Sequence, residues 1–198
     1  MRSDQFVTGS YNPLPLIKPS KAPRETVMSV SLYEASIPTF LLTLGNLQKI
    51  LEKAVAHAEA RKFDPNVFVS MRLYPDMLPL ARQIQIASDA AKGAAARLTG
   101  TEPPKFEDTE STMADLVARV AKTIDYLQSF KAEQFAGAEE RAITIKTPRN
   151  EFKFNGLNYL RHWALPNLFF HSTVAYSLLR HGGVEIGKAD YLGQVPQL

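Results

Sequence analysis

The chain contains no cysteine among its 198 residues. This absence excludes disulfides, cysteine-ligated zinc, iron–sulfur clusters and a cysteine nucleophile, and it is compatible with the cytoplasmic location that we expect. The sequence also lacks the spacings His-Glu-x-x-His and Glu-x-x-His. It therefore predicts neither a zinc-protease helix nor the paired helices of a di-iron bundle.

The chain has no run of basic residues, although its formal net charge is +3. Residues 1–27 hold four basic and two acidic side chains, so the remainder is close to neutral. Nucleic-acid binding requires a basic patch, and we therefore predict no nucleic-acid partner. We predict no membrane partner either, because the longest apolar segment, residues 157–179, contains Arg161, His162, Asn167 and His171.

Residues 1–27 differ in composition from the rest of the chain. They contain four of the 13 prolines and no apolar run long enough for the hydrophobic region of a signal peptide. We expect this segment to be an extended or flexible arm or a leader; Met28 as the true initiator is the alternative. Residues 28–198 are predicted to form one domain.

Four segments have apolar residues at helical spacing. The first is predicted to begin at Ser36 with Pro38 in its opening turn, and the second to begin after Pro75 and end at Gly100. The third opens with Thr112 and Asp115, a capping pattern. The fourth spans residues 157–181 and contains Pro166, where we expect a kink or a displaced hydrogen bond.

A short β-hairpin is predicted between the third and fourth helices. Residues 143–147 and 151–155 alternate apolar and polar side chains on either side of a turn at residues 148–150. An isolated hairpin is marginally stable, so its apolar face should lie against the helices. The predicted fold class is all-α, an up-down four-helix bundle with a long third connection that contains this hairpin.

The fourth helix holds the candidate site. It is apolar on almost every face, so it should be buried on every face, yet it carries Asn167 and His171 four residues apart. A buried histidine needs a polar partner. His171 is therefore either a structural residue that binds a neighbouring helix or a residue of a ligand pocket.

The second helix offers partners for His171. Gln85 and Asp89 lie four residues apart, beside its apolar stripe. If that edge faces the fourth helix, Gln85, Asp89, Asn167 and His171 converge into one ligand-binding pocket, in which Asp89 would raise the pKa of His171 and fix its tautomer. The alternative is that Asp89 faces solvent and pairs with Lys92 or Arg82.

Five further motifs are found along the chain: Leu73–Leu80, Gln83–Asp89, Asp108–Glu110, Phe170–Tyr176 and Leu179–Gly193. Together they resemble a bacterial and fungal family of unknown function within the DinB/YfiT-like superfamily. The resemblance covers about residues 28–193 and implies a four-helix bundle that is frequently dimeric. We accordingly expect a homodimer.

The resemblance also implies a divalent metal in the better-studied relatives, which include metal-dependent thiol transferases and hydrolases. Those relatives hold the metal with one histidine on the second helix and a His-x-x-x-His pair on the last. His171 matches the first histidine of the pair, Ala175 stands at the second, and Gln85 or Gln83 stands on the second helix. One ligand of three cannot hold zinc or nickel tightly, so we predict no metal and no other cofactor.

Three functional hypotheses follow. The first is a protein that binds a small molecule in a metal-free polar pocket, or lacks catalysis. The second is an enzyme in which His171, oriented by Asp89, acts as an acid or base, or in which a weakly held metal is completed by Asp89 and water. The third is a dimeric scaffold whose aromatic residues Phe63, Phe68 and Trp163 serve only dimerisation.

Overall fold

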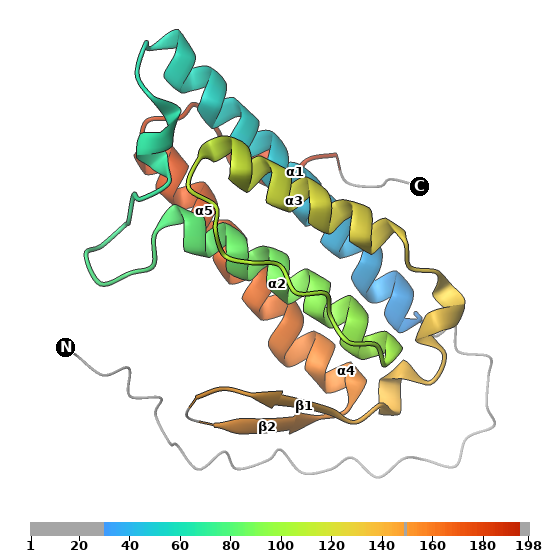
Figure 1. Ribbon diagram of the computed structural model, residues 1–198. Coiled ribbons are helices and arrows are strands. Elements are labelled where there is room, and N and C mark those ends of the chain that lie inside the picture. The colour runs from blue at the N-terminus through green and yellow to red at the C-terminus, as the bar shows by residue number, and fades with distance from the viewer. Residues whose placement is uncertain (1–29, 149, 195–198) are drawn as a thin grey trace.

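The computed structural model describes residues 30–148 and 150–194. The predicted N-terminal arm, residues 1–27, lies outside the described residues, as does Arg149 in the predicted hairpin turn. The main helices are α1 (Leu32–Ala60), α2 (Leu80–Thr99), α3 (Met113–Gln128) and α5 (Leu165–His181), with two short helices, α4 (Gly156–Tyr159) and α6 (Lys188–Leu192). Strands β1 (Ile143–Lys146) and β2 (Glu151–Phe154) form an antiparallel hairpin. Figure 1 shows the four long helices side by side and the hairpin at one end of the bundle.

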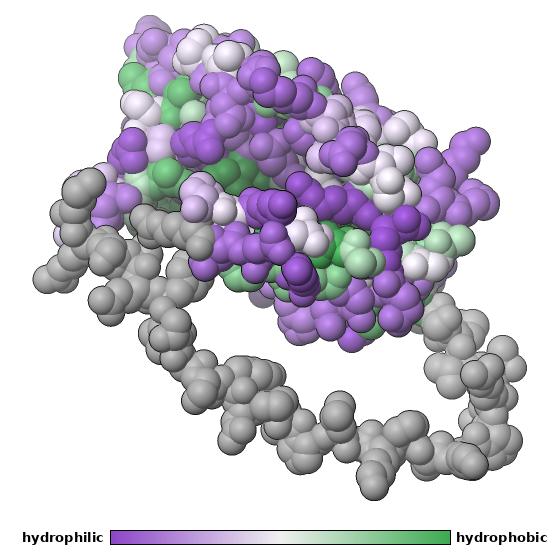
Figure 2. All heavy atoms as spheres, turned by 60° about the horizontal axis from the view of Figure 1, so that its bottom comes forward, coloured by the Kyte–Doolittle hydropathy of each residue, from purple (hydrophilic) through white to green (hydrophobic). Residues whose placement is uncertain are grey.

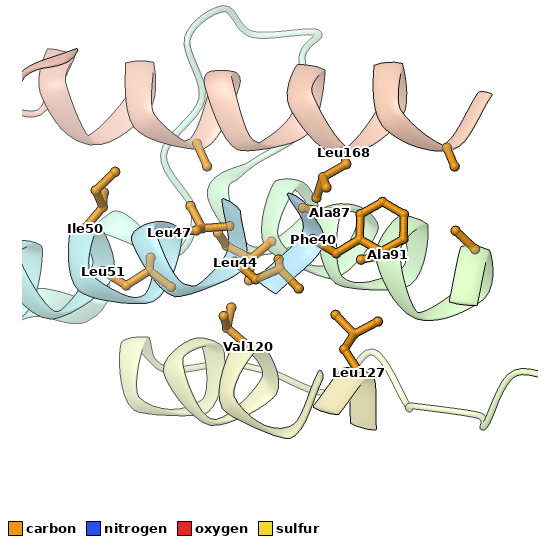
Figure 3. Close-up of a cluster of buried hydrophobic side chains, with 14 of the residues drawn as sticks. Phe40, Leu44, Leu47, Ile50, Leu51, Ala87, Ala91, Val120, Leu127 and Leu168 are labelled. Carbon is orange, nitrogen blue, oxygen red and sulfur yellow. The ribbon is translucent and has the colours of Figure 1, made fainter. Parts of the chain in front are cut away.

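The helices form the predicted four-helix bundle. The most extensive contacts pair α2 with α5 and α1 with α3, and α2 also packs on α3. Alanines on α2 let the neighbouring helices approach closely, while α1 supplies the larger side chains of the core. Buried residues labelled in Figure 3 include Phe40, Leu44, Leu47, Ile50 and Leu51 from α1, Ala87 and Ala91 from α2, Val120 and Leu127 from α3, and Leu168 from α5.

Two predicted helix starts are wrong. Helix α1 begins one turn earlier, because Ser31 and Glu34 form a capping box; Ser36 lies buried inside the helix and donates to the Leu32 carbonyl. Helix α2 begins later than predicted, at Leu80 after Pro79. A proline disfavours helical backbone in the residue before it, so the chain cannot enter the helix ahead of Pro79.

The other predicted local features are confirmed. Thr112 and Asp115 form the capping box of α3, and Gly100 ends α2 in the left-handed conformation. The fourth predicted helix runs without a break from α4 through a π-helical segment, Leu160–Ala164, into α5. The π segment ends two residues before Pro166. This proline has no N–H to donate, so the hydrogen bonds shift to a wider spacing there.

The hairpin covers the start of the fourth helical segment. Ile143 pairs with Phe154 and Ile145 with Phe152. The rings of Phe152 and Phe154 lie 5.0 Å and 5.9 Å from that of Trp163, measured between centroids. The apolar face of the hairpin therefore packs on the bundle, as predicted. No helix in the described part of the chain is long and apolar enough to cross a membrane.

Candidate functional site

His171 is buried between α5 and α2, and its partner is Gln83. The Nδ1 atom of His171 lies 2.7 Å from Oε1 of Gln83, and the two residues are 9% and 2% exposed. Of the two glutamines that could stand at this point of the second helix, the structure thus selects Gln83 over Gln85. The contact joins the two helices that pack most extensively on each other.

The surroundings of Gln83 fix the tautomer of His171. The Nε2 amide of Gln83 donates to the Leu78 carbonyl over 3.1 Å, which turns Oε1 of the same side chain toward the imidazole. An amide oxygen only accepts hydrogen bonds, so Nδ1 of His171 must carry the proton. Nε2 of His171 is then an acceptor, and it has no hydrogen-bond partner within residues 30–148 and 150–194.

His171 is held in its neutral form. Burial lowers the pKa of His171 below its ordinary value of 6.5, and the positive charge of Arg82 lowers it further. Both causes penalise the imidazolium ion. The acceptor at Nε2 is consequently retained at neutral pH.

The lowered pKa of His171 predicts a loss of stability in mild acid. Below about pH 6.5 the unfolded chain binds a proton at this residue more readily than the folded chain does. Stability should therefore fall as the pH drops from 6.5 toward the folded pKa, by at most about 1.4 kcal/mol per pH unit, and should not change above 6.5. Urea unfolding at pH 7.5 and 5.5 should show a larger loss for the wild type than for His171→Gln, whereas equal losses would show that His171 is not the group responsible.

Gln85 and Asp89 do not meet His171, so the predicted convergence of the four residues is wrong. Gln85 donates to Glu110 over 2.7 Å, and Asp89 pairs with Lys92 at 2.8 Å and with Arg119 at 3.1 Å. These contacts lie on the side of α2 that packs on α3. The alternative reading of Asp89, as a partner of Lys92, is the one that the structure supports.

Arg119 is the centre of this second cluster. Its side chain is almost fully buried and also pairs with Glu110 at 2.8 Å and with Asp108 at 3.1 Å, and it donates to the Glu107 carbonyl over 3.0 Å. Arg82 pairs with Asp108 as well. The cluster thus ties the segment between α2 and α3 to both helices, and its cations and carboxylates largely compensate one another.

Asn167 serves the backbone and not the site. Its side-chain amide donates over 2.7 Å to the carbonyl of Trp163, four residues earlier. That carbonyl belongs to the π-helical segment before Pro166. Asn167 therefore binds the backbone of its own helical segment, and it makes no hydrogen bond to His171.

Sequence reasoning missed Arg119, although a signal existed. Arg119 lies between Leu116 and Thr123 on the stripe of α3 that faces the bundle, so its spacing already placed it among buried residues. A buried cation needs carboxylates, and the nearby segment supplies Asp108 and Glu110.

The residues around His171 do not fit a metal ion. His171 and Gln83 are hydrogen-bonded to each other, and Ala175, one turn further along α5, has no donor atom. Throughout the described ranges, no three or more His, Asp or Glu side chains are placed to hold a metal. A tightly bound metal needs three or four such ligands.

The three aromatic residues proposed for dimerisation do not form one surface. Phe68 is 2% exposed and belongs to the core, and Trp163 packs against the hairpin. Phe63 alone is exposed, and its ring contacts those of His57 and Phe68.

Comparison with known proteins identifies the family. A family model described as a domain of unknown function, DUF1993, matches residues 32–192. The chain is also similar to a DinB family member protein from Shewanella denitrificans, whose crystal structure was solved at 1.83 Å resolution. The TM-score is 0.77 and the sequence identity 44%, over 84% of this chain and 94% of that chain. No curated protein matches. The chain therefore belongs to the DUF1993 family, whose unknown-function domain has the DinB-like helical fold.

Proposed function

We propose that the protein is a metal-free DinB-like protein that binds a small molecule at His171. The observation that carries the proposal is the chain of hydrogen bonds from His171 through Gln83 to the Leu78 carbonyl, which leaves Nε2 of His171 as an unpaired acceptor. Nε2 is not fully buried, so it keeps contact with solvent and a ligand can reach it. A ligand with an O–H or N–H donor would replace water as the partner of this acceptor.

The ring beside His171 favours an aromatic ligand. The ring of Phe170 lies 5.1 Å from the imidazole in an edge-on arrangement, and the side chain of Phe170 is exposed. Aromatic rings prefer such edge-on or offset contacts. A phenol combines the hydrogen-bond donor with an aromatic ring.

4-Ethylphenol tests the proposal, with 4-ethylanisole as a control that lacks the donor. We expect NMR titration to show saturable binding of the phenol alone, with a Kd on the order of 1 mM for so small a ligand. Binding should be lost in His171→Leu, which removes the acceptor, and kept in His162→Leu, which changes an exposed histidine of the same helical segment. No saturable binding to the wild type, or equal binding to His171→Leu, would refute the proposal.

Metal analysis tests the second part of the proposal, that the protein is metal-free. We expect purified, untagged wild type and His171→Ala to contain equally little metal by inductively coupled plasma mass spectrometry. We interpret the His171–Gln83 pair as the remnant of the metal site of related proteins. Near-stoichiometric metal that disappears in His171→Ala would contradict this and favour a metalloenzyme.

Acid–base catalysis is the second candidate function. The fixed tautomer of His171 favours it, because a neutral imidazole with the proton held at Nδ1 can accept a proton at Nε2. Gln83 would take the orienting role that the sequence assigned to Asp89. The homodimer implied by the family resemblance stays a proposal beside both functions.

A further inference from the structure

A hollow with three basic side chains lies at the end of the bundle that carries the hairpin. It has a volume of about 520 Å³ and is formed by the end of α2, residues 101–103 after it, and β1 with the two residues before it. Arg97, Arg141 and Lys146 line it together with a single carboxylate, Glu102. Hydrophilic residues cover much of this end of the molecule (Figure 2). The hollow is as large as many small-molecule sites.

Both guanidinium groups lie against glycines, one within α2 and one at its C-cap. The Arg141 guanidinium lies where a Cβ on Gly100 would be, and that of Arg97 lies where a Cβ on Gly93 would be. Arg97 also donates over 3.3 Å to the hydroxyl of Tyr159, and burial raises the pKa of that hydroxyl, which stays neutral. The neighbours of the two arginines therefore do not cancel their charges.

The positive charge of the hollow has little compensation. Within the described ranges, Arg97 and Arg141 form no ion pair, and Nε of Arg141 is buried without a hydrogen-bond partner. Lys146 reaches Glu151 only at 3.8 Å, and both side chains are solvent-exposed. Nε of Arg119 also lacks a hydrogen-bond partner, but that guanidinium is surrounded by three carboxylates. Arg97 and Arg141 have no such carboxylates, and their uncompensated charge points to a missing anion.

Capping of α2 does not account for the arginines. Cations favour a helix C-terminus, but three carbonyls near the end of α2 already have other partners. The Thr101 N–H donates to Ala96 over 2.8 Å, and the Gly100 N–H donates to Arg97 over 3.2 Å. The Thr99 hydroxyl donates to Ala95 over 2.9 Å. Neither guanidinium donates to these carbonyls.

We propose that this hollow binds the phosphoryl group of a phosphomonoester. Its three cations and one carboxylate give a formal charge of +2, and a phosphomonoester carries about −1.5 to −2 at neutral pH. The planar guanidinium group suits phosphate oxygens, to which it can donate two parallel hydrogen bonds. The site is independent of His171, because Arg97 lies about 21 Å along α2 from Gln83.

Glycerol 3-phosphate is the probe for the full-length protein. In NMR titrations at low salt, we expect saturable shifts of the amides of Thr101, Ala142 and Thr144. The Kd should rise at least tenfold in Arg141→Gln and in Arg97→Gln, and should stay within twofold in Arg161→Gln, which removes the same charge from an exposed arginine. Circular dichroism establishes that each variant is folded. If one of the two site variants fails to fold, the other is enough to test the proposal.

The phosphomonoester can be a lipid headgroup or a free small molecule, and vesicles distinguish these two sources. Co-sedimentation with phosphatidic acid vesicles, but not with phosphatidylcholine vesicles, would assign the phosphoryl group to a lipid; binding of glycerol 3-phosphate alone would assign it to a small molecule. Both results support the proposal if Arg141→Gln abolishes them. Absence of binding in both arms, or an equal loss in Arg161→Gln, would overturn it.

Discussion

Replacing Gly156 with alanine is expected to destabilise the fold by about 3 kcal/mol or more. Gly156 opens α4, and a Cβ there would overlap the carbonyl oxygen of Ala138 and lie 2.9 Å from its carbon. It would also lie 3.3 Å from a methyl group of Leu98. The obstacle is backbone, which cannot rotate away as a side chain can. Thermal unfolding should show a Tm lower by about 6–12 °C.

Gly45→Ala is the matched control for Gly156→Ala. Gly45 lies inside α1, and a Cβ there would meet nothing within 4 Å. Glycine inside a helix costs about 0.5–1 kcal/mol relative to alanine, so this variant should be more stable than the wild type. The same substitution is thus expected to have opposite signs at the two positions. A decrease of similar size in both variants would show that contact with Ala138 is not the cause.

Predicting the effect at Gly156 from sequence was impossible, although much of the fold was predictable. The capping box of Thr112 and Asp115 and the alternation of the hairpin are local patterns, and they were read correctly. The start of α1 is harder to predict, because proline is typical of a first turn and Pro38 lies inside the helix. The contact of Gly156 with Ala138 depends on how two distant turns pack, and nothing in either segment encodes it locally.

The candidate site was only half predictable for a similar reason. His171 was identified because a polar residue in an apolar helix needs a partner. The partner was not identified, because Gln83 and Gln85 point about 200° apart on α2 and both are buried. Helix α2 packs on α3 on one side and α5 on another, so its apolar pattern does not indicate which side faces which helix. For the same reason the sequence leaves two readings of Asp89 open, and the structure supports its pairing with Lys92.

Replacing Arg119 with methionine is the second change with a large expected effect. Removing one partner of a buried ion pair costs about 3–5 kcal/mol. Asp89 and Asp108 are 44% and 40% exposed and can be solvated by water, whereas Glu110 is only 11% exposed. We therefore expect a loss of about 2–4 kcal/mol, measured by urea unfolding at pH 7.

Lys122→Met is the matched control for Arg119→Met, since it removes a cation from the same helix. Lys122 is exposed and lies 4.1 Å above the ring of Phe106, a contact worth about 0.5–1 kcal/mol. The loss in this variant should stay within that range. If Arg119→Met costs no more than Lys122→Met, the cluster does not hold the segment between α2 and α3 in place.

We expect the pH dependence of Arg119→Met to identify Glu110 as the carboxylate that carries most of the loss. Burial alone would raise the pKa of Glu110, but hydrogen bonds from Arg119 and Gln85 outweigh it and lower the pKa below 4.5. In the wild type this stabilisation is complete above the unfolded pKa and is lost as the pH falls through the folded pKa. Without Arg119, the remaining burial favours the protonated acid, so the difference between wild type and variant should shrink from pH 7 to pH 4. Glu110→Gln should remove most of that pH dependence, because a neutral amide at this position neither needs the arginine nor titrates.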